Sequence, residues 1–486
     1  MKPKSNTYSF IVNPSYYTSP NLLVAPAGYG KTHTIAKSVD VLQKNGNDSI
    51  LVLTHTNAGI TSISEKFKKE SVSTRQVTIC TIAGFLQRIV HPLSKTPLQQ
   101  GENQNDFYSQ LYANALNLFK NNNLILRNTI ENSYKHIFVD EFQDCNKPQY
   151  EIVRIMSKWD IRVHMLLDSL QTIFNFDPDH PNYLDFENRC CKLTPDKVFV
   201  LDIPYRWRNA NSPLEQCVTQ WRTVIHDAVS HGNKSIDLTQ LQGVTYISGT
   251  YSDARNKINS YIRKPGDVLV LHSNYHANNI IARGHVCVGS GYKLRIIESI
   301  DNADFYNLAS AIDQSIKNDD SVEAIVYSIL QESGVSSTNL DKWIKINRLV
   351  AKKSDKEKEL ASILSSSIGS QPKELAILES IGVITNKIGL PVQRIELLSE
   401  ILSAISSSLS SGHTVLDEVT CKRNRARVQG RKLYGKIIGT TLLTKGLEAD
   451  TVILVKPSEL FKDKDGLKHL YVALTRAVKE IVLIDY

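Results

Sequence analysis

The sequence has no long apolar run and few cysteines for a chain of 486 residues. No stretch approaches the roughly 18 apolar residues that cross a bilayer, and the N-terminus shows no apolar segment of signal-peptide length. The seven cysteines are odd in number and contain no Cys-x-x-Cys pair, which favours reduced thiols and argues against a zinc or iron–sulfur site. We therefore expect a cytoplasmic protein that is neither secreted nor membrane-spanning.

Charge of one sign is not in large excess either. The 57 Lys and Arg residues and the 49 Asp and Glu residues give a net charge of +8, which permits binding to a polyanion without requiring it. An apolar content of 41% and a charged content of 22% are ordinary for a globular protein. The length predicts about three domains.

The chain does contain a glycine-rich loop of the kind that binds phosphate. Residues 25–32 read Ala-Pro-Ala-Gly-Tyr-Gly-Lys-Thr and stand between an apolar run and a helical pattern, which is the order that a phosphate cradle requires. Gly28 and Gly30 let backbone N–H groups turn toward the phosphates. Lys31 is expected to reach the β and γ phosphates, and Thr32 to ligate Mg²⁺. The expected nucleotide contacts in this loop are Ala27, Gly28, Tyr29, Gly30, Lys31 and Thr32.

Two carboxylates follow an apolar run about 110 residues later. Asp140 and Glu141 come directly after residues 137–139, Ile-Phe-Val, as at the carboxyl end of a buried parallel strand. Asp140 is suited to hold Mg²⁺, and Glu141 to orient and deprotonate an attacking water. Alone, this pattern could be a strand that runs into an acidic turn. With the phosphate loop, it predicts hydrolysis of a nucleoside triphosphate.

Short apolar runs alternate with helical patterns from residue 22 to about residue 201, and a second such rhythm begins near residue 244. This alternation is typical of parallel α/β sheets. Helical patterns interrupt the rhythm at about residues 85–133 and 300–421, and the sheet pattern resumes near residue 437. The sequence therefore predicts two α/β halves, each interrupted by helices.

Further segments occur in a recognisable order between the loop and the C-terminus. They are residues 53–58, 80–81, 140–144, 167–174, 205–206, 445–448 and 472–477. With the phosphate loop, this series resembles the superfamily 1 helicases of the UvrD/Rep/PcrA type, and in particular short members such as the helicase-like B subunit of Gabija anti-phage systems. The runs Asp-Glu-Phe-Gln-Asp and Val-Ala-Leu-Thr-Arg-Ala are the most specific to this group.

The resemblance implies an α/β fold with two RecA-like P-loop NTPase domains and a helical insertion in each. The expected ranges are 1–85 and 134–204 for the first domain, 86–133 for its short insertion, 205–298 and 430–486 for the second domain, and 299–429 for its insertion.

The resemblance also implies further residues of the nucleotide site. Gln171 would sense the γ phosphate, and Arg206 and Arg476 would stabilise the charge that develops on the transferring phosphoryl group. Glu448 matches a residue near the ribose. Without the family pattern, such a Gln is more often a solvated loop residue, and either Arg a partner in a surface ion pair.

Single-stranded nucleic acid is bound by stacking bases on aromatic rings while polar groups hold the backbone. The resemblance implies backbone contacts from Thr54, Thr56, Asn57 and Thr81. It places Phe174 and Phe176 beside the strand path; the alternative for Phe174 is a core residue. The basic cluster at residues 422–432 could bind phosphates or form a solvated face.

Several positions depart from the family pattern. Residues 8–21 hold no Gln to read adenine, so the choice of ATP over other triphosphates stays open. His55 replaces the usual Phe, Asp177 replaces an Arg, and Leu442 replaces a His. All these changes bear on base reading or coupling, whereas the set of residues for phosphate chemistry is complete.

We therefore expect an enzyme that uses ATP and Mg²⁺ to move on single-stranded or tailed duplex DNA, in anti-phage defence or DNA repair. The alternative is a DNA-triggered switch subunit that regulates a partner nuclease, for example of the OLD family, with little unwinding. A nucleic-acid-binding scaffold with a relict site is a further alternative. No membrane partner is expected.

Overall fold

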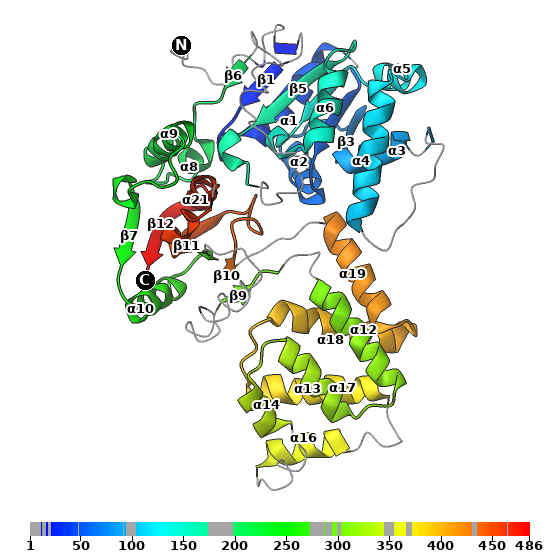
Figure 1. Ribbon diagram of the computed structural model, residues 1–486, viewed down its shortest axis with the longest axis vertical. Helices are drawn as coiled ribbons and strands as arrows, with labels where there is room; N and C mark the ends of the chain where they lie inside the picture. The colour runs from blue at the N-terminus through cyan, green and yellow to red at the C-terminus, as the bar shows by residue number, and fades with distance from the viewer. Residues whose placement is uncertain are drawn as a thin grey trace. The chain divides into compact units, whose positions relative to one another are not determined.

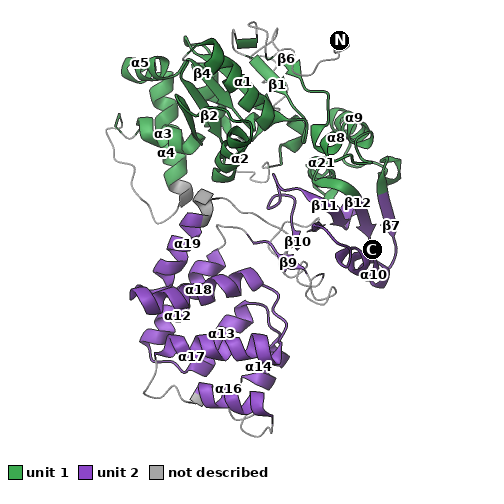
Figure 2. Ribbon diagram, turned by 180° about the vertical axis from the view of Figure 1, so that it is seen from behind, with its two compact units in different colours: residues 1–244, 460–480 green, residues 245–459, 481–486 purple. Residues whose placement is uncertain are grey.

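The computed structural model forms two compact units, which are Met1–Val244 with Leu460–Glu480, and Thr245–Glu459 with Ile481–Tyr486 (Figure 2). The residues that the structure describes are 21–46, 48–90, 92–93, 104–173, 198–272, 294–298, 303–344, 354–365, 372–429, 435–463 and 465–486, with Ile11, Tyr16, Tyr17 and Val286.

The first unit is built on a six-stranded sheet in the order β3-β2-β4-β5-β1-β6, with parallel pairing throughout (Figure 1). Strands β2 and β4 are buried along their whole length, which explains why they read as unbroken apolar runs. The strands are β1 (Asn21–Val24), β2 (Ile50–Thr54), β3 (Val77–Thr81), β4 (His136–Val139), β5 (Arg162–Leu167) and β6 (Val198–Val200).

Helices follow these strands in the manner of α/β crossovers. Figure 1 shows α3, α4 and α5 together beside the sheet, and they share one apolar core with β2, β4 and α6. The helices of this unit are α1 (Lys31–Asn45), α2 (Asn57–Lys69), α3 (Ile82–Val90), α4 (Gln104–Lys120), α5 (Leu124–Ser133), η2 (Phe142–Asp144), α6 (Lys147–Met156), η3 (Ser169–Gln171), α8 (Tyr205–Asn209), α9 (Cys217–Ser230), η4 (Leu238–Gln240) and α21 (Gly466–Leu474).

The first compact unit includes residues 205–244 and 460–480, which the sequence analysis assigned to the second domain. Two fully buried tryptophans help to hold these segments together. The indole N–H of Trp207 donates to the carbonyl of Ala477 at 2.8 Å, and that of Trp221 donates to the carbonyl of Gln242 at 2.7 Å. These contacts help to explain why α8, α9 and α21 belong to the same compact unit as the phosphate loop.

The second unit contains a sheet in the order β7-β12-β11-β8-β10-β9, in which β11, β8, β10 and β9 pair in parallel. Helix α10 (Tyr251–Ile262) covers it with a buried face. The strands are β7 (Val244–Ser248), β8 (Val268–His272), β9 (Arg295–Ile296), β10 (Lys436–Gly439), β11 (Ala449–Val455) and β12 (Ala477–Asp485), and the short α20 (Pro457–Leu460) follows β11. The fold is therefore α/β with two RecA-like parallel sheets.

A helical module interrupts this second sheet between β9 and β10 and has its own apolar core. Arg394, at the start of α18, forms a buried ion pair with Glu298 beside β9 and a second, 2.8 Å contact with Asp304. The helices are α12 (Ala303–Lys317), α13 (Val322–Glu332), α14 (Ser337–Trp343), α16 (Asp355–Ser365), α17 (Lys373–Gly382), the π-helix η5 (Val383–Ile388), α18 (Ile395–Ser411) and α19 (Val415–Gln429).

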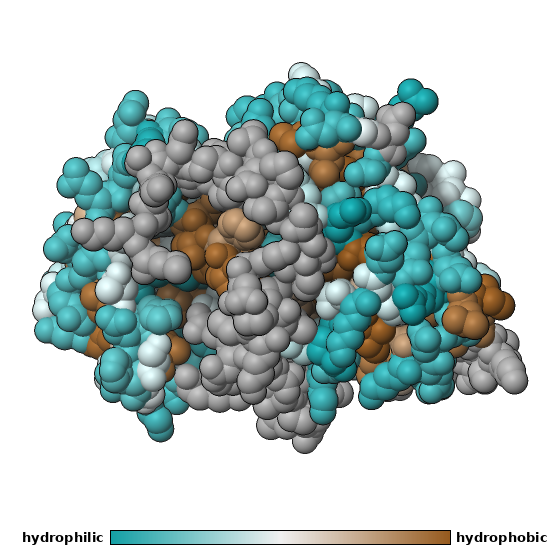
Figure 3. All heavy atoms as spheres, turned by 90° about the horizontal axis from the view of Figure 1, so that it is seen from above, coloured by the Kyte–Doolittle hydropathy of each residue, from teal (hydrophilic) through white to brown (hydrophobic). Residues whose placement is uncertain are grey.

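The surface seen from above is largely hydrophilic where it is described, with apolar side chains in small separate groups (Figure 3), as is usual for globular proteins. Within the described residues, no helix combines the length and apolarity needed to cross a membrane.

Candidate nucleotide site

The phosphate loop connects β1 to α1 and needs glycine at two positions. Gly28 has φ 75° and Gly30, the N-cap of α1, has φ 100°, which L side chains rarely adopt. Space is also limited, because a Cβ on Gly28 would lie 2.6 Å from the ring of Trp207. The loop therefore requires Gly28 for both conformation and close packing.

Lys31 is the first residue of α1, and its side chain is buried. Its Nζ lies 3.1 Å from Oε1 of Glu141 and donates to the carbonyl of Ala25 at 3.4 Å. Burial lowers the pKa of Lys31, but the nearby charges of Glu141, Asp168 and Asp140 outweigh it, so the pKa is raised above its ordinary value. The expected phosphate-binding lysine is thus a cation held beside the expected general base.

The two carboxylates that follow β4 have different surroundings. Asp140 is buried, and its Oδ1 accepts no hydrogen bond from the residues that the structure describes. Burial, aided by the charge of Glu141, raises the pKa of Asp140 to about 7 against the opposing charge of Lys31. Glu141 is partly exposed and has φ 50°, a strained conformation for a residue other than glycine that is typical of functional sites.

These residues fit a magnesium ion. An unpaired, buried carboxylate oxygen on Asp140 is an environment that a cation would stabilise, and the hydroxyl of Thr32 is a second hard oxygen donor in the first turn of α1. Mg²⁺ bound with a nucleotide uses one or two protein ligands, phosphate oxygens and water. The described part of the chain has no cluster of three or more His, Cys, Asp or Glu that could hold a metal.

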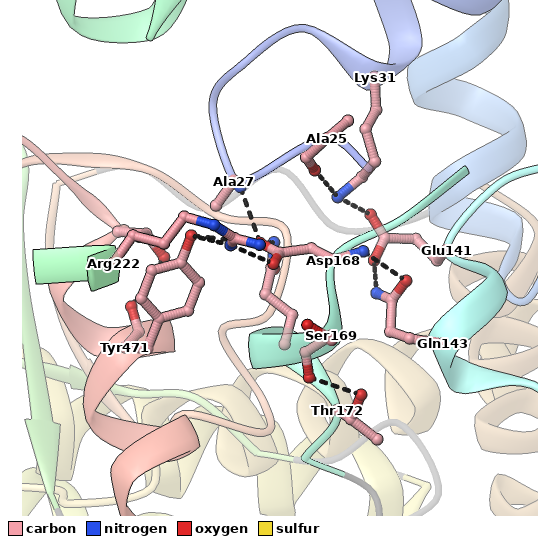
Figure 4. A network of polar contacts seen from close by, with 12 residues as sticks. Ala25, Ala27, Lys31, Glu141, Gln143, Asp168, Ser169, Thr172, Arg222 and Tyr471 are labelled. Atoms are coloured by element: carbon pink, nitrogen blue, oxygen red, sulfur yellow. Dashed lines mark hydrogen bonds and ion pairs between the residues drawn. The ribbon is translucent and has the colours of Figure 1, made fainter. Parts of the chain in front are cut away.

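Asp168, the residue after β5, lies at the centre of the polar network in Figure 4. It is fully buried, and its Oδ2 accepts from the backbone N–H of Ala27 at 2.9 Å, from Nε2 of Gln171 at 2.9 Å and from the hydroxyl of Tyr471 at 3.3 Å. Its Oδ1 accepts from Nη1 of Arg222 at 2.6 Å. One carboxylate therefore contacts the phosphate loop, the expected γ-phosphate sensor, and helices α9 and α21.

Gln143 links the ends of β4 and β5. Its Oε1 accepts the backbone N–H of Asp168 at 3.1 Å, and its Nε2 donates to Glu141. The side chain is fully buried. The expected base is thus tied to the network around Asp168.

Three residues expected to act on the γ phosphate lie close to this network. Nη2 of Arg476 donates to Oε1 of Gln171 at 3.3 Å, and both side chains are buried. The guanidinium of Arg206 donates to the carbonyl of Thr475, and its backbone N–H donates to the carbonyl of Gly28 at 3.0 Å. The segment with Thr475 and Arg476 therefore contacts both Gln171 and Arg206, and Arg206 also contacts the phosphate loop.

Other expected nucleotide contacts have structural partners. The Tyr29 side chain is buried, and its hydroxyl lies 3.1 Å from Oγ1 of Thr219 on α9, where it packs the loop against a helix. The amide of Ala27 is occupied by Asp168. Glu448 belongs to the second compact unit, is exposed and precedes β11.

The residues expected to hold a nucleic-acid backbone lie at the carboxyl ends of two neighbouring strands. Thr54 and Thr81 are directly paired in the register of β2 and β3. Thr56 caps α2 by accepting from the N–H of Gly59, and Thr81 likewise accepts from the N–H of Gly84. Asn57 begins α2 and is partly exposed. Phe174 and Phe176 fall outside the residues that the structure describes.

Asp168, Arg222 and Tyr471 are not among the residues that the sequence led us to expect at the site. Asp168 follows an apolar strand as Asp140 does, so the same signal could have found it. Tyr471 directly precedes the Val-Ala-Leu-Thr-Arg-Ala run. Arg222 lies in an ordinary amphipathic helix and has no local signal at all.

Comparison with known proteins identifies domains at both ends of the chain. A family described as the UvrD/REP helicase N-terminal domain matches residues 10–107 and 96–190, and the UvrD-like helicase C-terminal domain matches residues 440–484. The first match contains the phosphate loop and the two carboxylates, and the second contains Arg476.

The chain is also similar to curated proteins, of which it spans about a fifth of the length. The ATP-dependent DNA helicase PcrA of Staphylococcus epidermidis is 27% identical over 148 residues, or 26% of this chain and 20% of PcrA. The RecBCD enzyme subunit RecB of Borreliella burgdorferi is 24% identical over 236 residues, or 43% of this chain and 20% of RecB.

Among solved structures, the Pif1 helicase from Candida albicans aligns over 55% of this chain and 56% of its own, with 13% identity and a TM-score of 0.30. That score is too low to support an argument. The two domain matches lie in the order of the phosphate loop and Arg476, so both ends of the chain are similar to domains of UvrD-type helicases.

Proposed function

We propose that this protein hydrolyses ATP with Mg²⁺ and couples hydrolysis to movement along single-stranded DNA. The observation that carries the proposal is the Lys31–Glu141 pair, 3.1 Å apart, beside the buried Asp140 and within one compact unit with the Gln171–Arg476 contact. The similarity of both ends of the chain to UvrD-type helicase domains supports the same activity.

In this proposal each residue has a role that its surroundings allow. Lys31 and the loop amides other than that of Ala27 bind the phosphates, and Thr32 with Asp140 holds Mg²⁺, which when bound neutralises charge on the β and γ phosphates. Glu141 accepts a proton from the attacking water. Gln171, Arg206 and Arg476 then stabilise the charge on the transferring phosphoryl group.

The pairing of Lys31 with Glu141 bears on when hydrolysis starts. A carboxylate that forms an ion pair is a weaker base than a free one, because the cation stabilises its charged form. The phosphates of a nucleotide would compete with Glu141 for the Nζ of Lys31, 3.1 Å away. Nucleotide binding would therefore free the general base for the attacking water.

We assign the nucleic-acid backbone contacts to Thr54, Thr56, Asn57 and Thr81, at the carboxyl ends of β2 and β3. Thr56 and Thr81 each accept a backbone hydrogen bond through the hydroxyl oxygen. A hydroxyl that accepts still has its own hydrogen to donate, so both remain suited to bind phosphate. Phe174 and Phe176 remain the proposed stacking residues, and Glu448 the proposed ribose contact.

Phosphate release measured without nucleic acid, and with single-stranded DNA, duplex DNA or RNA, tests this function. We expect hydrolysis of ATP that single-stranded DNA stimulates, and displacement of a strand from a tailed duplex. The variant Lys31→Ala is the matched negative control. Absence of phosphate release under all of these conditions would refute the proposal and favour a relict site.

A second candidate is a DNA-triggered switch that controls a partner nuclease, for example of the OLD family, in anti-phage defence. It is favoured by His55, which replaces the family's stacking Phe and whose Nε2 lies 3.6 Å from Sγ of Cys145, directly after the Asp-Glu-Phe-Gln-Asp run. The His55 imidazole therefore connects residues 53–58, which we expect to bind DNA, with the segment that carries Asp140 and Glu141. DNA-stimulated hydrolysis without strand displacement, with or without the nuclease, would favour this candidate.

We also propose that the protein works in the reducing cytoplasm. Among the described residues, Cys80, Cys145, Cys217 and Cys421 are free thiols, as is usual for proteins of that compartment. Titration of thiols in protein purified without reductant tests this proposal, and a disulfide recovered from cells would argue against it.

A further inference from the structure

Arg222 contacts the centre of the nucleotide site from a segment that neither family domain matches. It lies on α9, between the matched residues 10–190 and 440–484. Its Nη1 lies 2.6 Å from Oδ1 of Asp168 and donates to the hydroxyl of Tyr471 at 3.2 Å. Figure 4 shows Arg222 and Tyr471 together on one side of Asp168, with Lys31 and Glu141 on the other.

A buried carboxylate such as Asp168 requires a cation or several donors to stay ionised. Asp168 is 0% exposed, and burial raises its pKa, but the charges of Arg222 and Lys31 outweigh burial and leave the pKa below its ordinary value. The Arg222 side chain is 19% exposed, so this ion pair is largely shielded from solvent. Shielding makes the loss of one partner costly, because the other charge is left buried.

Asp168 in turn holds two parts of the site. Its Oδ2 accepts from the backbone N–H of Ala27 in the phosphate loop and from Nε2 of Gln171, each at 2.9 Å. The other end of the Gln171 amide accepts from Arg476. The orientation of Gln171 therefore depends on an ionised Asp168, since a protonated carboxyl would lose acceptor capacity.

We propose that Arg222 is a positioning residue for hydrolysis, which acts through Asp168 to fix Gln171 and the phosphate loop. The inference rests on the proposed function, in which Gln171 acts on the γ phosphate. Arg222 touches no reacting atom in this scheme. A small displacement of a group that contacts the transition state lowers turnover strongly, by up to about 10²-fold for 1 Å.

The loss of Arg222 should affect turnover more than nucleotide binding. The amide of Ala27 is already used by Asp168, so it is not among the donors available to phosphate. Lys31 is held by other contacts, with Glu141 and the carbonyl of Ala25, and the carbonyl of Gly28 in the loop accepts from the backbone N–H of Arg206. We therefore expect kcat to fall while KM for ATP changes little.

The experiment is a double-mutant cycle on the full chain, with ATP hydrolysis measured in the presence of single-stranded DNA. The variants are Arg222→Gln, Arg222→Lys, Asp168→Asn and the double variant Arg222→Gln/Asp168→Asn. Arg154→Gln, which removes the partly exposed ion pair with Glu151 on α6, is the matched control.

We expect Arg222→Gln to lower kcat about tenfold or more with KM within about threefold of wild type. Arg222→Lys should restore part of the loss, because it keeps the charge without the planar guanidinium. The double variant should be no slower than Asp168→Asn, since the effects of two residues that act as a pair do not multiply.

A wild-type kcat in Arg222→Gln, or losses that multiply in the double variant, would overturn the role of Arg222 while leaving the proposed function intact. Absence of hydrolysis by the wild-type chain would instead overturn the proposed function itself. If Arg222→Gln does not fold, the double variant decides, because it removes the buried charge on both partners. A double variant that is slower than Asp168→Asn would then contradict the inference.

Discussion

Gln143 accepts the backbone N–H of Asp168 through its side-chain Oε1 at 3.1 Å, while its Nε2 donates to Glu141. One buried amide thus joins the ends of two neighbouring strands, one carrying the proposed base and the other the proposed sensor segment. Because Asp168 also binds Ala27, a shift at Gln143 would reach the phosphate loop through a single further contact.

Replacing Gln143 by Met should therefore affect both stability and turnover. Met preserves the length of the side chain but leaves the N–H of Asp168 buried without its acceptor, which costs about 1–3 kcal/mol. We expect the free energy of unfolding in urea to fall by that amount and kcat to fall with it. Gln220→Met is the matched control, because Gln220 also uses both ends of its amide, toward the carbonyl of Gln240 and the N–H of Gln242, but in an exposed setting. Equal effects of the two variants would contradict the special role of Gln143.

Replacing Glu141 by Gln should abolish turnover and leave nucleotide binding intact. Gln has nearly the same shape but no basicity, and loss of a general base typically costs about 10²–10⁴ in rate. Lys31 loses its partner at 3.1 Å, so its charge becomes more available to phosphate. Phosphate release and binding of a fluorescent ATP analogue measure the two effects. Glu151→Gln, in a partly exposed pair with Arg154, is the control, and wild-type turnover in Glu141→Gln would show that another group is the base.

The parts of the site that the sequence predicted are those with a local pattern. The phosphate loop and the carboxylates after β4 each combine an apolar strand with a short polar run, and the structure places Lys31 and Glu141 in contact. The meeting of Gln171 with Arg476 required the family resemblance, because these residues are 305 positions apart.

What the sequence could not predict depends on tertiary packing. Arg222 and Asp168 are 54 positions apart, and a buried ion pair leaves no periodic pattern on the helix that carries it. Tyr29 could not be recognised as a packing residue, because its partner Thr219 lies on a helix 190 positions away. The inclusion of α8 and α9 in the first unit likewise follows from the burial of Trp207 and Trp221. No local sequence motif predicts that these two side chains are buried.

Replacing Gly28 by Ala should weaken nucleotide binding far more than its backbone conformation alone explains. Gly28 and Gly232 have almost the same φ, 75° and 74°, but a Cβ on Gly28 would lie 2.6 Å from Trp207, whereas one on Gly232 meets no atom of the described residues within 4 Å. Gly232→Ala should therefore cost only the left-handed conformation, about 1–2 kcal/mol. Gly28→Ala must also displace the loop from a buried ring, and we expect at least about tenfold weaker ATP binding, or 1.4 kcal/mol. Titration of both variants with a fluorescent ATP analogue checks this. Equal affinities would show that the Trp207 ring can move to accept a Cβ on Gly28 without weakening ATP binding.

Acid should destabilise the first unit through two stacked histidines at the far end of its strands. His136 and His164, on adjacent strands β4 and β5, are buried with ring centroids 5.3 Å apart and Nδ1 of the first 3.0 Å from Nε2 of the second. Burial lowers the pKa of His136 to about 4 despite the nearby charge of Asp48, and burial with the charges of His136 and Arg162 lowers the pKa of His164 well below its ordinary value. Both rings are thus neutral in the folded chain at neutral pH.

A histidine whose folded pKa is depressed makes the unfolded chain bind more protons below its unfolded pKa of about 6.5. Stability is therefore complete above pH 6.5 and is lost as the pH falls from 6.5 toward 4, by up to about 1.4 kcal/mol per pH unit for each histidine. Unfolding in urea between pH 7 and pH 4.5 measures this slope. His164→Gln removes one titrating group and should lower the number of protons taken up on unfolding by up to one. Gln can still bond to Asn21, the 2.8 Å partner of His164, so the variant should fold. The exposed His231 supplies the control variant His231→Gln. A slope that His164→Gln leaves unchanged would mean that other groups, such as the carboxylates, govern acid unfolding in this range.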